Sequence, residues 1–419
     1  MWEKPIGVDL FAGAGGLSLG FEQAGFDVLA AVEYDPIHAA THEFNFPGCA
    51  TICRSVADID GDYIRSNSKI GKSDVDVVFG GAPCQGFSMI GKRALDDPRN
   101  HLVYHFVRVV SELRPKFFVF ENVRGLTVGE HKKFLKEIIS EFQAKGYKVQ
   151  EDYRVLNALN YGVPQNRQRL FLMGARKGQR LPDYPAGTHE LRGSNRDLGF
   201  TESTPTVWDA LGDLPEADDF EELLERDWVE ADFANPSAYA RGLRFGTVKS
   251  SNILTSSLRT VHTTLSQDRF KATVAGDTEP VSRFLKLDPN GVCNTIRAGT
   301  ASDRGAFTSP RPIHPFSPRC ITVREAARLH SYPDWFRFHV TKWHGFRQVG
   351  NSVPPLLGQA VAAKLMEQLG KKVDVQMPRC VGDPSLLECK MSGAAERYGV
   401  SATVIPHRIR RIESGKVNG

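Results

Sequence analysis

Long hydrophobic runs and closely paired cysteines are what this 419-residue sequence lacks. No run of about 18 uncharged apolar residues occurs, so a membrane-spanning helix is not expected. The seven cysteines include no CxxC pair, and their odd number and wide scatter argue against the disulfide framework of a small secreted protein. The first residues run straight into an apolar segment without the features of a signal peptide. We therefore expect a soluble, cytoplasmic protein with free thiols.

The composition is that of an ordinary globular protein. Hydrophobic residues make up 41% and charged residues 24% of the chain, which at this length is enough for about two to three domain-sized cores. Lys and Arg number 53 against 49 Asp and Glu, a net charge of +4 that permits a nucleic-acid partner without requiring one. The spacing of four neighbouring metal-ligand types matches no common zinc finger, so no metal site is predicted at His38, His42, Cys49 and Cys53.

Strand-like and helical patterns alternate over roughly the first 175 residues. Uniformly apolar runs predict buried strands at 5–11, 28–32, 75–79 and 117–120, and helical spacing predicts helices at 17–25, 102–113 and up to Phe44. Strands of this kind suit a parallel sheet that is covered on both faces. We therefore predict an α/β fold, a Rossmann-like sheet with helices on both faces.

The texture changes after about residue 182, where Pro, Gly, Ser and Asp become frequent and periodicity weakens. Residues 216–232 carry nine acids and one Arg, a pattern more typical of a solvated helical face than of a ligand site. The helical period returns at 321–329 and 356–369. We predict a catalytic and cofactor-binding domain at 1–185, a smaller loop-rich domain at 186–315, a return to the first domain at 316–370 and a C-terminal appendix at 371–419.

A glycine-rich turn follows the first predicted strand. From Asp9 to Gly16 the missing side chains would let a nucleotide-like ligand approach the backbone, although a plain tight turn would use the same glycines. Glu33 follows Gly13 by 20 residues, where an acid can accept hydrogen bonds from ribose hydroxyls. Residue 18 is Ser, so the dinucleotide pattern G-x-G-x-x-G is incomplete. Together these features favour an adenosine-containing cofactor and count against NAD.

Two further motifs follow predicted strands. Cys84 lies in the loop Gly80–Ser88, at the sheet edge where parallel α/β proteins bind ligands. A buried structural thiol would be expected inside a helix or strand, whereas a Pro/Gly loop suits an exposed nucleophile. Glu121 follows the run at 117–120, where a carboxylate can protonate or hydrogen-bond a substrate, and an N-cap of the next helix is the alternative.

Two arginines precede the apolar run at 170–173. In a strand, Arg167 and Arg169 would point to one face and present two cations to an anion or to a developing negative charge. Two surface arginines would be the alternative.

In this order, the segments resemble the cytosine-5 DNA methyltransferases of bacterial restriction-modification systems. The resemblance extends over nearly all of residues 5–176 and 319–365 and rests on the combination of DLFAGAGGLSLGFEQAGF, the acid of AAVEYDP, GGAPCQGFSMIGKR, FVFENVRGL, QNRQRLFLMGAR, ITVREAARLHSYPDWF and QVGNSVPPLLGQAVA. The central stretch, which the resemblance does not cover, is the target recognition domain in this family.

The resemblance implies methyl transfer from S-adenosylmethionine to carbon 5 of a cytosine flipped out of double-stranded DNA, with S-adenosylhomocysteine as the product. Cys84 matches the nucleophile that adds to carbon 6, and Glu121 matches the glutamate that contacts ring nitrogen 3. Arg167 and Arg169 match the pair that supports the base. The family's cofactor contacts carry over to Phe11, Gly13, Gly15, Glu33, Tyr34, Asp58, Ile59, Pro83, Leu102, Asn351, Ser352 and Val353.

The expected DNA contacts are Ser88 of the catalytic loop and basic residues of the central stretch, which are Arg241, Arg244, Lys249, Arg259, Arg269 and Lys271. We expect a monomer on DNA, associated with the nucleoid through that DNA, with a restriction endonuclease as its genetic partner. An RNA cytosine-5 methyltransferase on the same scaffold is the nearest alternative. The complete set of Cys84, Glu121 and the two arginines argues against a third hypothesis, a catalytically idle DNA-binding homologue.

Overall fold

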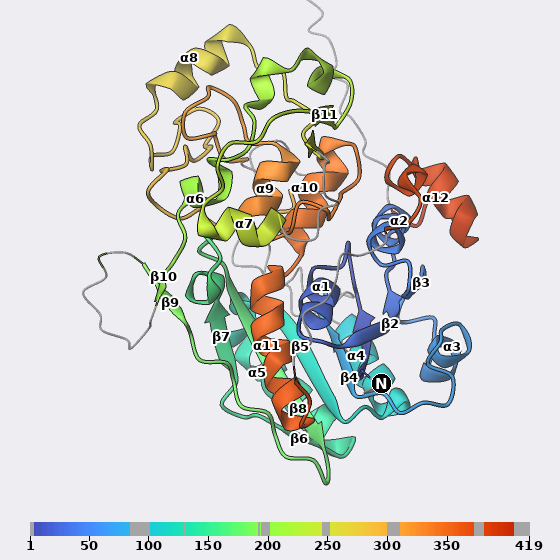
Figure 1. The fold of residues 1–419 in the computed structure, drawn as a ribbon. Coiled ribbons are helices and arrows are strands. Elements are labelled where there is room, and N and C mark those ends of the chain that lie inside the picture. Colours follow the sequence, from blue (N-terminus) through green and yellow to red (C-terminus); the bar gives the residue numbers. More distant parts are fainter. Residues whose placement is uncertain are drawn as a thin grey trace, which may run out of the picture.

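Two lobes are visible in Figure 1, with a large sheet in the lower lobe and short helices and loops in the upper lobe. The fold is that of a computed structural model, which describes residues 4–83, 101–129, 131–191, 193, 202–244, 252–299, 311–372 and 381–405. None of the helices within these ranges is long and apolar enough to cross a bilayer.

The lower lobe is built on an eight-stranded sheet. Its strands are β1 Ile6–Leu10, β2 Asp27–Val32, β3 Ala50–Ile52, β4 Val77–Gly80, β5 Phe117–Val123, β6 Tyr147–Val149, β7 Arg154–Asn157 and β8 Gln168–Arg176. Their order is β3-β2-β1-β4-β5-β8-β6, with β7 also paired to β8. The predicted α/β fold is confirmed. The strands predicted from apolar runs, β1, β2, β4 and β5, pair in parallel as expected, whereas β8 runs antiparallel to β5, β6 and β7. The short link from β7 to β8 permits this reversal without a crossover helix.

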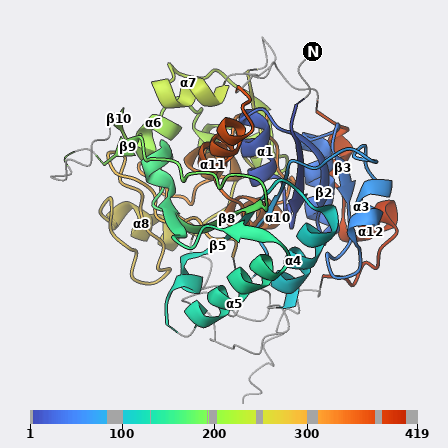
Figure 2. The ribbon, with the colours of Figure 1, turned by 90° about the horizontal axis from the view of Figure 1, so that it is seen from below.

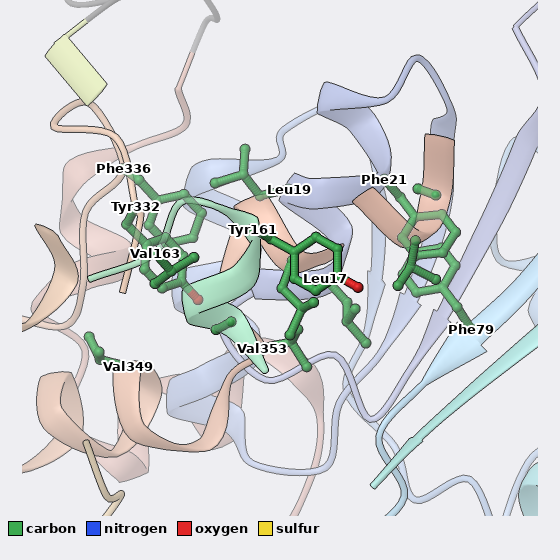
Figure 3. Close-up of a cluster of buried hydrophobic side chains, with 14 of the residues drawn as sticks. Leu17, Leu19, Phe21, Phe79, Tyr161, Val163, Tyr332, Phe336, Val349 and Val353 are labelled. Carbon is green, nitrogen blue, oxygen red and sulfur yellow. The ribbon is translucent and has the colours of Figure 1, made fainter. Parts of the chain in front are cut away.

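Helices cover both faces of this sheet, as Figure 2 shows. α1 (Gly16–Gln23) and α11 (Pro355–Gln368) pack together on one face, and α4 (His101–Leu113) and α5 (His131–Ala144) pack on the other. Successive strand residues alternate between the two cores: Phe79 lies in the first and Val78 in the second. On the first face, the rings of Phe21 and Phe79 stack with centroids 3.7 Å apart (Figure 3). This double burial is why the strands are uniformly apolar.

The edge of the sheet beside β3 carries α2 (Pro36–Asn45) and α3 (Gly61–Ser66). The Asp35 side chain caps α2 by accepting a hydrogen bond from the Ile37 amide. The chain returns to this edge near its end, where η8 (Pro384–Leu387) and α12 (Met391–Tyr398) pack against α2. Sequence periodicity predicted α2 but neither β3 nor this docking.

The upper lobe is loop-rich, as predicted for the central stretch. Its elements are α6 Val207–Leu211, η5 Ala217–Asp219, η6 Glu221–Leu224, β11 Val229–Glu230, α7 Ala238–Arg244, β12 Ile253–Leu254, α8 Thr264–Ala272, α9 Val323–Leu329 and α10 Lys342–Asn351. The helices predicted at 321–329 and 356–369 are confirmed as α9 and α11. α11 packs on α1 of the lower lobe, whereas α9 packs on α6 and α10.

The acidic run at 216–232 is not the solvated helical face that its composition predicted. It forms two short 3-10 helices and one short strand. The Glu216 carboxylate lies 2.6 Å from the Arg319 guanidinium. The Asp218 carboxylate lies 2.9 Å from the Arg259 guanidinium. Several acids of this run therefore stabilise the fold of the lobe through ion pairs with arginines that are distant in the sequence.

Candidate active site

The candidate site lies at the edge of the sheet where β1, β4 and β5 end. From β1, the strand order proceeds to β2 and β3 on one side and to β4 and β5 on the other. Ligands of open α/β sheets bind at such a switch point, outside the carboxyl ends of the strands. Because β8 is antiparallel to β5, its first residues meet the same edge, where Arg169 pairs with Val123 in the ladder.

The glycine turn after β1 takes backbone conformations that favour glycine. Gly13 and Gly15 have φ values of +57° and +101°, and Phe11 holds a strained φ of +63°. A Cβ on Gly15 would lie 2.3 Å from the Phe46 ring. At Gly13, in contrast, a Cβ would meet no atom of the described residues within 4 Å. The turn is therefore packed on one side and open on the other.

Glu33 faces this turn from the end of β2. Its carboxylate accepts hydrogen bonds from the Gly13 amide (2.7 Å) and the Asp35 amide (2.8 Å). Burial raises the pKa of Glu33, although these amides oppose the shift. A carboxylate has about four lone-pair positions, so two amides leave acceptor capacity for further donors. Tyr34, the next residue, is 44% exposed.

A buried polar chain lies beneath the turn and explains the serine at position 18. The Ser18 hydroxyl donates to Asp9 Oδ2 (2.7 Å) and lies 3.2 Å from His42 Nε2. The other ring nitrogen of His42 lies 3.2 Å from the Thr51 hydroxyl. Burial raises the pKa of Asp9 to about 8 and lowers that of His42 to about 3. Ser18 thus supports the turn from below through its side-chain hydroxyl, a role that a third glycine could not fill.

Other predicted cofactor residues reach the same turn from the end of α10. A Cβ on Gly16 would lie 2.6 Å from the Val353 carbonyl and 2.8 Å from the Ser352 Cβ, so only glycine permits this approach. Asn351 is the last residue of α10 and is exposed. Residues 351–353, more than 300 positions after the turn, therefore lie against it.

The remaining predicted cofactor residues adjoin α4. Ile59 is buried, and its carbonyl accepts a hydrogen bond from Arg108 of α4 (2.8 Å). Asp58 beside it is exposed, and Leu102 in the first turn of α4 is half-buried. Pro83 is half-buried at the end of the described segment that follows β4.

Glu121 and Arg169 form an ion pair at this edge. Arg169 Nε lies 2.9 Å from Glu121 Oε1, and both side chains are largely buried. Burial raises the pKa of Glu121 despite the opposing charges of Arg169 and Arg167. The sequence placed Glu121 just after the strand and left an N-cap of the next helix as an alternative role. In the structure, β5 continues through Val123 and includes Glu121. Glu121 is therefore held by a sheet.

Two glycines bring the chain after β4 against Glu121. A Cβ on Gly80 would lie 1.9 Å from the Leu10 carbonyl, and a Cβ on Gly81 would lie 2.5 Å from Glu121 Oε2. The Asn122 amide donates to the Ala82 carbonyl (3.1 Å). Cys84 and Ser88 lie outside the described residues, as does Lys249. Cys84 nevertheless follows Ala82 by two residues, which connects it covalently to the segment beside Glu121.

Arg167 lies one residue before β8 and is fully buried, so the alternative of a surface arginine does not hold for it. Its guanidinium donates to the carbonyls of Ile296 (2.9 Å), Gly350 (2.8 Å) and Ser352 (2.7 Å). Burial lowers the pKa of Arg167, and the nearby charge of Arg169 lowers it further. Arg167 therefore joins three distant segments behind the Glu121–Arg169 pair.

Sequence reasoning assigned no role to Gln165, the first residue of the same motif. The fully buried Gln165 side chain donates to the Leu329 carbonyl (3.2 Å) and accepts from the Ile296 amide (3.1 Å). It also lies 3.0 Å from His330 Nδ1. Its place in the motif was the available signal, because its partners lie more than 130 residues away.

The basic residues predicted to contact DNA fall into two groups. Arg241 and Lys271 are exposed. Three others form ion pairs inside the upper lobe: Arg244 with Asp213 (3.7 Å), Arg259 with Asp218 (2.9 Å) and Arg269 with Glu279 (3.6 Å).

The family model of C-5 cytosine-specific DNA methylases matches residues 7–367. The chain belongs to this family. It is 62% identical over 421 residues to the Type II methyltransferase M.XorII of Xanthomonas oryzae pv. oryzae, covering 98% of this chain and 96% of that protein. Its identity to the Type II methyltransferase M.AgeI of Thalassovita gelatinovora is 32%, over 85% of this chain and 97% of the relative. The predicted family is thus confirmed, and the chain is a DNA cytosine-5 methyltransferase.

Solved structures agree with this assignment. A protein from E. coli described as a DNA modification methyltransferase encoded within a prophage superposes with a TM-score of 0.72 at 33% identity, covering 88% of this chain and all of that one. The Dnmt2 methyltransferase of S. pombe superposes with a TM-score of 0.54 at 14% identity, a likeness of fold alone.

Proposed function

We propose that this methyltransferase transfers a methyl group from S-adenosylmethionine to carbon 5 of a flipped-out cytosine in a specific double-stranded DNA sequence, through a covalent Cys84 adduct. The observation that carries the proposal is the Glu121–Arg169 pair, 2.9 Å apart, against which Gly81 brings the chain that leads to Cys84. The glycine turn opens at the same sheet edge. A buried acid, the glycine turn and the chain that leads to Cys84 therefore meet at one edge of the sheet.

Each residue has a defined chemical task in this reaction. The Cys84 thiolate forms a bond to carbon 6, the electron pair of the 5,6 double bond shifts to the bond between carbons 4 and 5, and negative charge develops on ring nitrogen 3. Glu121 hydrogen-bonds ring nitrogen 3 and offsets the charge that develops there, and Arg169 holds its carboxyl group in place. When bound, S-adenosylmethionine would supply its methyl group to carbon 5 and leave as S-adenosylhomocysteine. Loss of the carbon 5 proton to a base restores the double bond and expels Cys84 as a thiolate.

The turn after β1 fits an adenosine-containing donor. Gly13 leaves open space where a ligand can approach the backbone, and Glu33 retains acceptor capacity for two ribose hydroxyls. The exposed ring of Tyr34 is available to stack on an adenine. Ser352 and Val353 lie against the turn at Gly16.

We further propose that residues 186–315 are the target recognition domain and that the enzyme protects host DNA from a cognate restriction endonuclease. The second proposal is supported by relatives that are named Type II methyltransferases. Grafting residues 186–315 into a family member of different specificity tests the first. Bisulfite sequencing should show that the chimera methylates the donor's sequence; methylation at the recipient's sequence would refute this domain assignment.

A substrate analogue tests the covalent mechanism directly. In a duplex that contains 5-fluorocytosine, fluorine cannot leave carbon 5 as a proton does, so the adduct should persist after methyl transfer. Mass spectrometry should find the wild-type chain and the Cys389→Ser control bound to DNA, and Cys84→Ser unbound. An adduct in Cys84→Ser would exclude Cys84 as the nucleophile. Faster methylation of tRNA than of duplex DNA would favour an RNA substrate instead.

A further inference from the structure

The C-terminal segment, residues 381–405, packs against α2 at the edge of the lower lobe. Figure 1 shows α12 beside α2. Leu386 and Leu387 are buried against Ala40 and Phe44 of α2. The Gly382 amide donates to the Phe44 carbonyl (2.7 Å). The segment lies beyond residue 367, where the match to the family model ends.

Polar contacts fix the second half of this segment. Arg397 Nε donates to Glu43 Oε2 (3.2 Å), and the Tyr398 hydroxyl donates to the same oxygen (2.7 Å). Arg54, just after β3, donates to the Tyr398 carbonyl (2.9 Å). These contacts orient the end of α12 toward the end of β2.

The segment ends on a residue of the cofactor site. The Tyr34 hydroxyl donates to the Val404 carbonyl (2.8 Å). Tyr34 directly follows Glu33, whose carboxylate binds the Gly13 amide in the glycine turn. One hydrogen bond therefore connects the C-terminal segment to the residue beside the predicted ribose acceptor.

We propose that the C-terminal segment is a positioning element for S-adenosylmethionine binding, and that Val404 holds the Tyr34 ring in its binding orientation. The proposal rests on the cofactor site proposed above. An exposed tyrosine must lose rotamer freedom when a ligand stacks on it, and a ring already tethered at its hydroxyl loses less. The segment would thus increase cofactor affinity without contacting the cofactor.

Two shortened chains and one point variant test the hydrogen bond between the Tyr34 hydroxyl and the Val404 carbonyl. A chain ending at Val400 retains α12 and lacks Val404, whereas a chain ending at Pro406 retains Val404 and lacks only the residues after it, including the basic cluster at 407–411. Isothermal titration calorimetry with S-adenosylmethionine should give a dissociation constant about 2- to 10-fold higher for Tyr34→Phe, the range expected for one newly ordered side chain. The chain ending at Val400 should match Tyr34→Phe, and the chain ending at Pro406 should match the wild type.

The double variant decides the mechanism. Tyr34→Phe placed in the chain ending at Val400 should cause no further loss, because its acceptor is already absent. Independent losses that multiply would overturn the proposal, because the hydroxyl would then act on something other than Val404. If the chain ending at Val400 fails to fold, a chain ending at Ala402 keeps more of the segment, lacks the same acceptor and supplies the same cycle.

Glu33→Ala separates this proposal from the one on which it rests. If Glu33→Ala weakens binding and Tyr34→Phe does not, the C-terminal segment has no positioning role and the cofactor site stands. If neither wild type nor variant binds S-adenosylmethionine, the proposed cofactor site itself is wrong.

Discussion

In the lower lobe, the strands of one sheet bury apolar side chains on both faces. In the outer part of the upper lobe, residues 213–285, the apolar clusters are small, and ion pairs between buried side chains hold the segments together. Phe79 and Phe118 are both fully buried in the lower lobe. In the outer part of the upper lobe, one cluster consists of five buried residues, among them Leu223. Arginines from the segment that precedes α9, and from α9 itself, bind its carboxylates: Arg319 binds Glu216, and Arg328 binds Asp213.

This difference matches the two tasks proposed for the lobes. Catalytic groups need fixed geometry, and dense apolar packing on both faces of a sheet supplies it to Glu121 and Arg169. A recognition surface must vary in sequence between relatives, and loops held by directional ion pairs can vary without a shared core. The upper lobe should therefore respond more strongly to loss of charge than the lower lobe.

The largest expected effect comes from Arg328. It is fully buried, and its guanidinium lies 2.9 Å from Asp213 and 2.7 Å from Asp334. Arg328→Ala leaves Asp213 and Asp334 with only the longer contacts to Arg244 (3.7 Å) and Arg324 (3.8 Å). The free energy of unfolding should therefore fall by about 3–5 kcal/mol. The control Arg226→Ala removes an exposed ion pair with Glu222, whose charged atoms lie 3.8 Å apart, and should lower the free energy of unfolding by at most about 1 kcal/mol. Urea denaturation measures both; equal losses would show that the buried pairs do not hold the upper lobe.

A second prediction concerns pH. Burial alone would raise the pKa of Glu325, but Arg319 and His314 lower it to about 2, below its ordinary value of 4.5. A pKa lowered by folding stabilises the protein above pH 4.5, and this stabilisation is lost as the pH falls from 4.5 toward 2. The loss should approach about 3 kcal/mol. Stability measured against pH should therefore decline less steeply in Glu325→Gln than in the wild type. Parallel curves would contradict this pKa.

Local patterns predicted the parts of the molecule that depend on neighbours in the sequence. The apolar runs located β1, β2, β4 and β5, because strands buried on both faces are uniformly apolar. The motifs located Glu33 just after β2 and Glu121 near the end of β5. Arg167 could not be understood in this way, since its partners Ile296 and Gly350 lie far along the chain. The acids of 216–232 were misinterpreted for the same reason. Composition records their charge but not the arginines that they meet.

The third prediction isolates the cofactor site in the lower lobe. Glu33→Ala removes the acceptor proposed for the ribose hydroxyls and should weaken S-adenosylmethionine binding by about 1.5–3 kcal/mol, the range of hydrogen bonds to charged groups. Calorimetry of the free enzyme measures this change, and DNA affinity measured in parallel should stay the same. Unchanged cofactor affinity would remove Glu33 from the site.

The smallest expected effect distinguishes two arginines of the upper lobe. Arg241 on α7 is exposed, whereas Arg259 donates to Asp218 (3.0 Å) and to the Phe220 carbonyl (3.1 Å). If Arg241 neutralises a phosphate, Arg241→Ala should weaken binding to all duplexes alike and reduce the slope of log affinity against log salt by about one, without changing stability. Arg259→Ala should lower stability before it changes that slope, because its charge already has a partner. Fluorescence anisotropy across a salt series, paired with thermal melts, measures both quantities. If Arg241→Ala instead relaxed the preference at one base position, Arg241 would be a base-reading residue; a reduced salt slope for Arg259→Ala at full stability would show that its ion pair opens when DNA binds.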